Sequence, residues 1–340
     1  CDEKNIGRRY AEFNDLDTKD DARLWLISNT IHWLPTVDFD LIVIDEAHHA
    51  DGNSYKGLLL SYEAYKPSGP LVLGLTATPY RRHAGEIVRL TSSVFSFSNP
   101  KINIFEEIAY ERSFCELAAQ GFVAPFRHVR YETNIKFSLA WDGNLHDFKQ
   151  DSLDQLDTPK RNKIIYDIWK QKEDVYGKTL IFVGTQKHSR RLAKYFAEDG
   201  VYVVSEMDRE QRRDAIADFR NNRIKVLINV GIFKEGVDVP DIRTIILARP
   251  TASPMLFTQM IGRGSRILPN KRFFYLLDIH DQLGKYEGYL MGVKDLDDND
   301  GKHVRTIEQR SEAAERVSHN KLCSLMQDPR VIVELLSTSV

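Results

Sequence analysis

Short apolar runs alternate along this chain with amphipathic stretches whose apolar residues recur at the 3.6-residue spacing of surface helices. The clearest helical spacing covers residues 186–198 and 209–220. The apolar runs have the length of buried strands, and they span residues 24–27, 41–44, 71–75, 179–183, 201–204, 225–229, 244–247 and 273–277. Strands that alternate with helices are typical of parallel units rather than of hairpins or bundles. The pattern therefore predicts an α/β fold with mainly parallel sheets.

One polar stretch, residues 136–158, interrupts this rhythm and contains the turn cluster Trp141-Asp142-Gly143-Asn144. We place the boundary between two domains just before it, near Pro125. The predicted division is a first domain over residues 1–125, a crossover over 126–157, a second domain over 158–294, and an acidic linker with a helical tail over 295–340. The tail contains no motif, so a solvated terminal helix or part of a further domain is its simplest interpretation.

The composition agrees with two domains and limits the possible functions. The chain has 340 residues, of which 42% are hydrophobic, so it is too long for one small core. Its 47 Lys and Arg residues nearly balance its 49 Asp and Glu residues. A nucleic-acid surface would therefore have to be a local groove rather than a general basic field.

The three cysteines, Cys1, Cys115 and Cys323, lie far apart and form no CxxC pair. This spacing argues against a disulfide framework and against a zinc site, and it favours a reducing, intracellular location such as the cytoplasm. No apolar run reaches the length of a membrane span, so no membrane association is expected. Because the first residues lack both an initiator Met and the pattern of a signal peptide, we expect the chain to begin within a longer protein.

The strongest chemical signal is an apolar strand that ends abruptly in Asp45-Glu46-Ala47-His48-His49. Ligands collect at the carboxyl ends of parallel strands, so both acids would lie at the mouth of a site. Magnesium prefers oxygen ligands, which suits Asp45, and Glu46 could accept a proton from an attacking water as general base. The alternatives are a polar turn with incidental acids, or a metal site that includes the two histidines.

A second strand ends in small hydroxyl residues, Thr76-Ala77-Thr78-Pro79. These hydroxyls could hydrogen-bond to His48 and carry information from a phosphate site to a nucleic-acid surface. On its own the tripeptide is a weak signal, since Ser and Thr are common as N-caps before helices.

A third group of residues lies in the C-terminal half, where residues 236–241 precede a strand and residues 259–266 follow it. Arg263 and Arg266 are three apart, and on a helix they would lie on one face and could point at one anion. Phosphoryl transfer gains most from charge stabilisation of its transition state, which arginines supply. The alternative is a surface helix with two solvated arginines.

Taken together, in their order and at strand ends, these segments resemble the motifs of the superfamily 2 helicases. Residues 45–48 resemble motif II, 76–78 motif III, 179–185 motif IV, 235–238 motif V and 259–266 motif VI. The particular residues of these motifs resemble the branch of XPB-type helicases and of type I and type III restriction motor subunits, over residues 23–280. The resemblance implies two RecA-like domains, the first of them incomplete, with ATP and Mg²⁺ as cofactors and ATP hydrolysis at the cleft between the domains.

The resemblance also implies a role for each matching residue. Asp45 would bind magnesium, Glu46 would activate water, and Arg263 and Arg266 would meet the γ-phosphate. Residues at the nucleotide would be Gly236, Asp238, which would meet the ribose or an arginine finger, and Gln259, which would order the domain interface. His48, Thr76 and Thr78 would couple the binding of ATP to the binding of nucleic acid. Thr30, Thr185 and Lys234 would contact nucleic-acid phosphates. Val230 departs from the pattern, because related motors often have Thr about there.

A glycine-rich phosphate-binding loop of the form GxxxxGK[ST] is absent from the sequence. Gly177-Lys178-Thr179 does not qualify, because it precedes a strand and the position five residues before Gly177 is Lys172. We therefore expect the chain alone not to turn over ATP, although the complete protein should be an ATP-dependent helicase or translocase. The motif variants favour double-stranded DNA as its track and a repair or restriction complex as a setting. An RNA helicase and a catalytically lapsed nucleic-acid-binding module are the alternatives.

Overall fold

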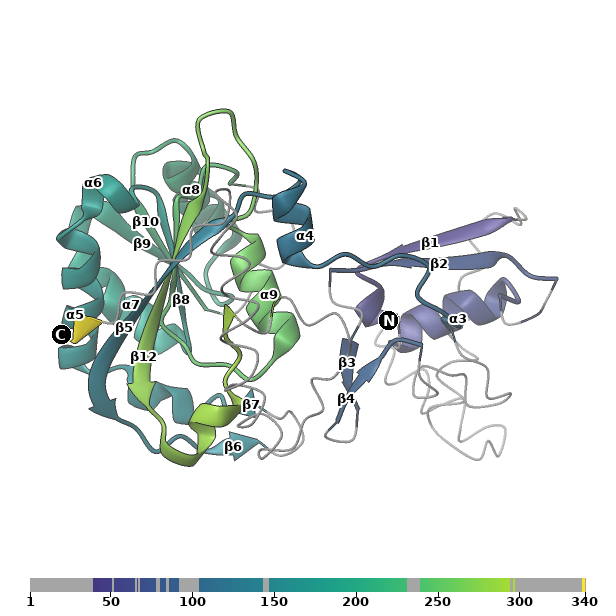
Figure 1. The fold of residues 1–340 in the computed structure, drawn as a ribbon, viewed down its shortest axis with the longest axis horizontal. Coiled ribbons are helices and arrows are strands. Elements are labelled where there is room, and N and C mark those ends of the chain that lie inside the picture. Colours follow the sequence, from purple (N-terminus) through teal and green to yellow (C-terminus); the bar gives the residue numbers. More distant parts are fainter. Residues whose placement is uncertain are drawn as a thin grey trace. The chain divides into compact units, whose positions relative to one another are not determined.

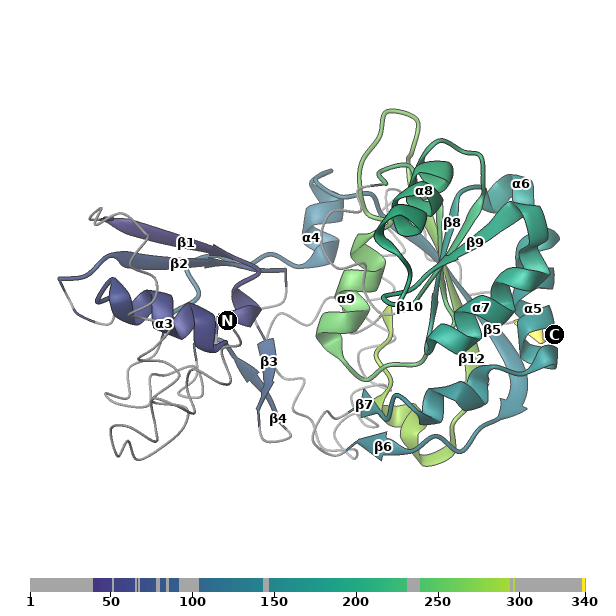
Figure 2. The ribbon, with the colours of Figure 1, turned by 180° about the vertical axis from the view of Figure 1, so that it is seen from behind.

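A computed structural model describes residues 39–50, 52–64, 66, 68–77, 80–83, 86–91, 104–142, 147–230, 239–293, 296 and 338–339. The chain divides into two compact units, Cys1–Glu111 and Arg112–Val340, which are drawn in Figure 1 and from behind in Figure 2. No helix in these described ranges is long and apolar enough to cross a membrane.

The first unit contains a parallel pair of strands, β1 (Leu41–Asp45) and β2 (Leu71–Leu75). Between them come a 3-10 turn, η1 (Ala47–His49), and a helix, α3 (Asn53–Ser61), and a hairpin of β3 (Tyr80–His83) and β4 (Glu86–Arg89) follows. One face of the pair packs on a small core that includes Ile44, Leu59 and Phe105. Gly74 allows this packing, because a Cβ there would lie 2.6 Å from the Phe105 ring and 2.8 Å from the Cβ of Ala47.

The opposite face of this strand pair is apolar and open to solvent. Its side chains alternate with the core residues, as the two-residue period of a strand requires. Five large aliphatic residues lie on it with exposed fractions of 40–75%: Leu41, Val43, Leu71, Leu73 and Leu75. Such a face is normally covered by another layer. Within the described residues of this unit, no second layer covers this face.

The second unit is built on a sheet with the strand order β13-β5-β12-β11-β8-β10-β9, in which every neighbouring pair is parallel. The strands are β5 (Phe126–Lys136), β8 (Thr179–Val183), β9 (Gly200–Val203), β10 (Val226–Val230), β11 (Thr244–Leu247), β12 (Phe274–Gln282) and the short β13 (Thr338–Ser339). Every residue of the central β8 is buried. Burial on both faces explains why such strands are almost continuous apolar runs in the sequence.

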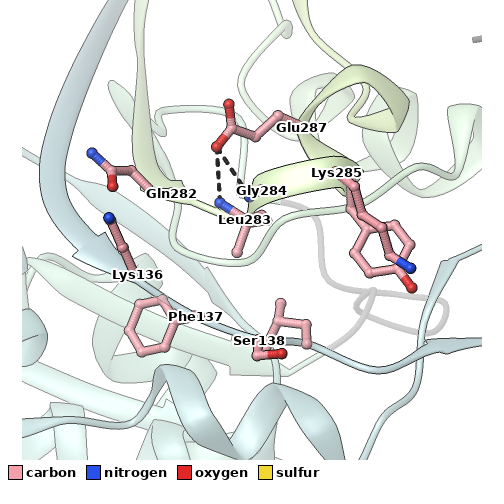
Figure 3. A pocket seen from close by; sticks show the side chains of 10 residues that line it. Lys136, Phe137, Ser138, Gln282, Leu283, Gly284, Lys285 and Glu287 are labelled. Carbon is pink, nitrogen blue, oxygen red and sulfur yellow. Dashed lines mark hydrogen bonds between the residues drawn. The ribbon is translucent and has the colours of Figure 1, made fainter.

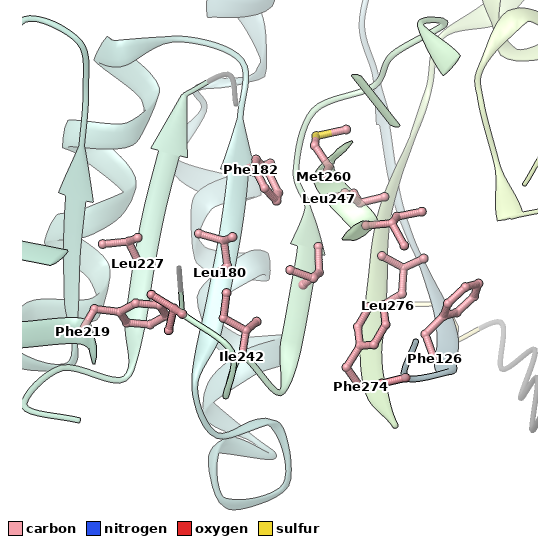
Figure 4. Packing of buried hydrophobic residues seen from close by; sticks show 14 of the residues in the cluster. Phe126, Leu180, Phe182, Phe219, Leu227, Ile242, Leu247, Met260, Phe274 and Leu276 are labelled. Atoms are coloured by element: carbon pink, nitrogen blue, oxygen red, sulfur yellow. The ribbon is translucent and has the colours of Figure 1, made fainter. Parts of the chain in front are cut away.

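Helices cover both faces of this sheet. One apolar layer joins the sheet to α8 (Arg209–Arg220) and α9 (Pro254–Gly262), with α4 (Phe114–Ala119) at its margin, and Figure 4 shows part of its packing. The other layer joins it to α5 (Pro159–Lys170), α6 (Glu173–Tyr176) and α7 (Gln186–Phe196). This three-layer arrangement is an α/β RecA-like fold, and it confirms the predicted fold class.

The apolar runs agree closely with most strands of the two parallel sheets, but they do not predict every strand. Residues 41–44, 71–75, 179–183, 201–204, 225–229, 244–247 and 273–277 all fall on strands, with ends that differ by a few residues at most except at β12, which continues to Gln282. The short strands β3, β4, β6 (Trp141–Asp142), β7 (Asp147–Phe148) and β13 were not predicted, and the longest strand without a predicted run is β5, which pairs with β12. Its polar positions, such as Arg127 and Arg130, are half-buried and alternate with buried ones. The guanidinium of Arg127 stacks 4.0 Å from the ring centroid of Phe273.

The division of the chain also differs from the expected boundary near Pro125 and the expected crossover over residues 126–157. The two units separate between Glu111 and Arg112. The polar stretch then forms β6 (Trp141–Asp142), β7 (Asp147–Phe148) and η3 (Ser152–Leu156) within the second unit. It has a small apolar core of its own, which contains Leu139, Phe148, Leu153, Leu156 and Leu283. Because these side chains are buried, the segment is a packed insertion and not a linker.

Candidate functional site

The end of β1 turns sharply at Glu46, which adopts a left-handed conformation with φ 51° and ψ 49°. The main-chain N–H of Glu46 donates to Oδ1 of Asp45 at 2.9 Å, and the carbonyl of Glu46 accepts from His49 at 2.9 Å. A residue other than glycine in this region costs about 1–3 kcal/mol and persists only where its surroundings hold it. Ala47 and Ala50, which follow Glu46 and are both buried, provide that support.

The imidazole of His48 joins the ends of β1 and β2. Its ring is buried, and Nδ1 lies 3.0 Å from the hydroxyl of Thr76 and 3.4 Å from Oε2 of Glu46. The two strands are in parallel register, with Asp45 opposite Leu75, so both segments emerge from the same edge of the sheet. The hydrogen bond between His48 and Thr76 that the sequence predicted is therefore present.

The two acids of this turn reach solvent. Asp45 is exposed, and 59% of the Glu46 side chain is accessible. Only Oδ1 of Asp45 accepts a hydrogen bond in the described part of the chain, which leaves Oδ2 for a cation. A carboxylate oxygen at a strand end is a suitable magnesium ligand. Within the described ranges, no three His, Cys, Asp or Glu side chains form a metal-binding group, so the alternative of a histidine-rich metal site receives no support.

The arginines of the C-terminal half lie at the end of α9 and beyond it. The helix begins after Ser253, whose hydroxyl accepts from the main-chain N–H of Leu256 at 3.4 Å, and it ends at Gly262. Arg263 is the C-cap and is half-buried, whereas Arg266 is exposed in the loop that follows. The prediction that both arginines lie on one helical face is therefore wrong.

A glycine explains why the helix stops there. A Cβ on Gly264 would lie 2.5 Å from a ring carbon of Phe274, so only glycine allows the chain to pass this close to β12. The N–H of Gly264 donates to the carbonyl of Ile261 at 2.9 Å and closes a turn. Gln259 lies one turn earlier in α9, and its buried Oε1 has no hydrogen-bond partner in the described part of the structure.

The loop between β11 and α9 is organised by Asp147, a residue that the sequence did not single out. Its Oδ1 accepts from the N–H groups of Ala252 at 3.0 Å and Phe148 at 2.9 Å, and its Oδ2 accepts from the hydroxyl of Thr251 at 2.8 Å. The Arg249 guanidinium lies 3.7 Å from the same carboxylate. Burial lowers the pKa of Arg249, and the charge of Asp147 opposes this shift. Asp147 thus joins the insertion to the segment that leads into α9.

Two family models match the chain: the helicase conserved C-terminal domain over residues 160–268 and the res subunit of type III restriction enzymes over residues 27–81. IRC3 of Saccharomyces cerevisiae, a candidate ATP-dependent helicase, is 30% identical over 266 residues, which are 76% of this chain and 36% of that protein. A candidate helicase of a Sulfolobus islandicus filamentous virus is 28% identical over 71% of this chain and 42% of its own. The chain belongs to the superfamily 2 helicases.

Solved structures agree with this family at the level of the fold. A fragment of a candidate HsdR subunit of a type I restriction enzyme from Vibrio vulnificus has a TM-score of 0.55 and 22% identity, over 79% of this chain and 48% of that one. The type ISP restriction-modification enzyme LlaBIII, solved bound to DNA, has a TM-score of 0.53 and 14% identity, over 99% of this chain and 25% of that one. Among the curated relatives, the helicase chain spans 36% of IRC3 and 42% of the viral protein.

Motif IV of this helicase chain ends at Thr185, the N-cap of α7. Its hydroxyl accepts from the N–H of His188 at 3.2 Å and lies 2.5 Å from Oδ1 of Asp154, to which it donates. His188 in turn lies 2.9 Å from Oδ1 of Asn162 through Nε2. Burial lowers the pKa of His188 to about 3, so the imidazole is neutral. The Thr185 hydroxyl is therefore already engaged, and a phosphate contact there would involve the main chain or a rearrangement.

A pocket of about 560 Å³ lies where β5 and β12 end, away from these motifs in the sequence. Figure 3 shows Lys136, Lys285 and Glu287 around it. The Glu287 carboxylate accepts from the N–H groups of Leu283 at 3.0 Å and Gly284 at 3.2 Å. Because the carboxylate takes up both donors, the pocket does not offer them to a phosphate group.

Several predicted site residues lie outside the described ranges. They are Thr30, Thr78, Lys234, Gly236 and Asp238.

Proposed function

We propose that this chain is the greater part of the motor of an ATP-dependent nucleic-acid helicase or translocase, and that double-stranded DNA is its track. The observation that carries the proposal is the hydrogen bond between His48 and Thr76, which joins the acidic end of β1 to the hydroxyl end of β2. A polar link of this kind, between the acids that would act on ATP and a neighbouring segment, is what coupling of two ligands requires.

We assign magnesium binding and the acid–base chemistry of the reaction to the two carboxylates at the end of β1. When bound with ATP, Mg²⁺ would neutralise charge on the phosphates. Asp45 would hold the cation through the carboxylate oxygen that accepts no hydrogen bond. Glu46 would take the proton from the attacking water. The left-handed turn at Glu46 supports this assignment, since strained backbone clusters at active sites.

In the second unit we assign charge stabilisation to Arg263 and Arg266. Arg263 caps α9 and Arg266 lies in the loop after it, on either side of the turn at Gly264. Stabilisation of the transition state by arginine is typically worth several orders of magnitude in phosphoryl transfer. Gln259 and Gly236 would lie at the nucleotide, and Asp238 would meet the ribose or an arginine finger.

For the nucleic acid, we propose contacts to phosphates at Thr30, Thr185 and Lys234, without reading of bases. The balance of 47 basic and 49 acidic residues supports a local surface of this kind. Binding should therefore be tolerant of sequence and should weaken as salt rises. The preference for double-stranded DNA rests on the motif variants that the chain shares with restriction motor subunits and XPB-type helicases.

We further propose that the 340 residues alone do not hydrolyse ATP. Phosphate binding in such motors depends on N–H groups of a glycine-rich loop and on its lysine, and no GxxxxGK[ST] sequence occurs in the chain. The arginines could attract a triphosphate, but they do not position it against Glu46. Positioning contributes most of the catalysis in phosphoryl transfer.

The experiment that tests this function is phosphate release by the complete protein with matched DNA and RNA duplexes. We expect stimulation by double-stranded DNA, and we expect Glu46→Gln to abolish turnover while ATP binding persists. Stimulation by RNA alone would replace the DNA assignment with an RNA helicase. Nucleic-acid binding with no turnover on any polymer would identify a lapsed binding module and contradict the proposal.

A further inference from the structure

Lys271 is a buried lysine that connects two main-chain segments of the second unit. It lies just before β12 and is 6% exposed. Its ammonium group donates to the carbonyl of Gly264 at 2.6 Å and to the carbonyl of Pro240 at 3.2 Å. The same Nζ lies 5.7 Å from the centroid of the Phe274 ring. These contacts fix the charged end of the side chain from three directions.

The two carbonyls belong to segments that the proposed function assigns to the nucleotide. Gly264 lies between Arg263 and Arg266, and Pro240 comes two residues after Asp238. β11 and α9 separate these segments in the sequence. One ammonium group therefore ties the turn that carries both arginines to the residues that follow Asp238.

No carboxylate pairs directly with Lys271 in the described part of the chain. Burial is the main cause that lowers its pKa, to about 8. Asp241 acts in the opposite direction, while Arg243 and Arg266 lower the pKa further. Asp241 is itself bound by Lys178, whose Nζ lies 2.7 Å from its Oδ2. The cation is thus held mainly by carbonyl oxygens.

We propose that Lys271 is a positioning residue, which sets the placement of Arg263 and Arg266 by clamping the carbonyls of Gly264 and Pro240. The clamp itself rests on the observed geometry, and its effect on catalysis rests on the proposed function of the arginines. A lysine that only filled space would be replaced by methionine with little effect on this turn. A charge-assisted clamp would not, because hydrogen bonds from a charged donor are roughly twice as strong as neutral ones.

The clamp predicts that catalysis and stability respond to pH in opposite directions. The unfolded chain keeps the Lys271 proton up to the ordinary pKa of 10.5, whereas the folded chain releases it near 8. Between these values the unfolded state binds more protons, so this lysine makes the folded state more stable as pH rises. The neutral amine, however, holds the two carbonyls less strongly. Turnover should therefore fall above about pH 8, while the contribution of Lys271 to the melting temperature rises.

The first test is hydrogen–deuterium exchange in this chain, which needs no turnover. At pH 7 we expect Lys271→Met to speed exchange at Gly264 and Ser265 about tenfold, the effect of losing one hydrogen bond from a charged donor. Lys163→Met is the control, because Lys163 lies on α5 and pairs with Asp167 in the same helix, away from the carbonyls that Lys271 binds. It should leave the exchange of this turn unchanged. Equal exchange in Lys271→Met and the unaltered chain would overturn the clamp.

The second test is the pH profile of turnover by the complete protein. We expect Lys271→Met to lower kcat more than it changes KM for ATP. Lys271→Arg, which stays charged, should restore part of kcat and remove the decline above pH 8. Turnover with an unchanged kcat and pH profile in Lys271→Met would overturn the positioning role. If neither the unaltered protein nor any variant turns over ATP, the proposed function fails. The exchange measurement then still tests whether Lys271 holds the two carbonyls.

Discussion

Asp147 is a residue whose replacement should strongly disturb the second unit. Its carboxylate accepts hydrogen bonds from Ala252, Phe148 and Thr251, and it is the nearest counter-charge to Arg249 at 3.7 Å. Only 13% of its side chain and 8% of the Arg249 side chain are exposed. Asp147→Ala would remove the acceptor of all three hydrogen-bond donors. It would also leave the Arg249 guanidinium without a counter-charge in a largely buried site.

The size of the effect follows from these contacts. Removing one partner of a buried charge pair costs about 3–5 kcal/mol, because the other charge stays buried. The three hydrogen bonds share one carboxylate, so their contributions are not added to this figure. We expect Asp147→Ala to lower the free energy of unfolding of the second unit by about 3–5 kcal/mol. Asp147→Asn keeps an acceptor oxygen but also leaves Arg249 without a counter-charge, so a cost at the lower end, about 3 kcal/mol, is expected.

Urea denaturation followed by circular dichroism measures these differences. Asp167→Asn is the control, because Asp167 forms an exposed pair with Lys163 four residues away, and its loss should cost less than about 0.5 kcal/mol. If Asp147→Ala costs less than about 1 kcal/mol, the carboxylate does not hold the loop and the reasoning from buried charge fails.

Three further predictions concern other parts of the chain. Burial lowers the pKa of His188 to about 3, so below pH 6.5 the unfolded chain binds a proton that the folded chain does not. Urea titrations should therefore show the free energy of unfolding falling by about 1.4 kcal/mol for each unit by which pH falls below 6.5. The same slope in His188→Gln would contradict this. Gly264→Ala places a Cβ 2.5 Å from the Phe274 ring and should cost about 1–3 kcal/mol, whereas Gly262→Ala, with nothing within 4 Å, should cost nothing. Leu73→Lys on the open apolar face should reduce light scattering at unchanged melting temperature, and equal scattering would mean that this face does not drive association.

The central strands could be predicted because burial leaves a direct mark on the sequence. In β8 every residue is buried, so the apolar run at 179–183 and the strand coincide. In β5 the half-buried Arg127 and Arg130 interrupt the apolar pattern; Arg127 lies over the Phe273 ring, and Arg130 lies 3.6 Å from Glu132. The sequence pattern therefore predicts a crossover where β5 lies.

The candidate site divides in the same way between local and distant signals. The hydrogen bond between His48 and Thr76 was predictable, because both residues follow apolar strands that pair in parallel. Asp147 was not, since Thr251 and Ala252 lie more than 100 residues away in the sequence. Nor was the end of α9, which depends on the close approach of Gly264 to Phe274. Spacing of arginines alone does not reveal a tertiary contact that stops a helix.

The most direct test of the account is DNA-stimulated phosphate release from two versions of the protein. One is the chain of 340 residues, and the other is extended upstream through a glycine-rich phosphate-binding loop. The account predicts no turnover by the shorter chain, and turnover by the extended version that Glu46→Gln abolishes. Turnover by the shorter chain that disappears in its Glu46→Gln variant, or an extended version that binds DNA and ATP without hydrolysis, would contradict it.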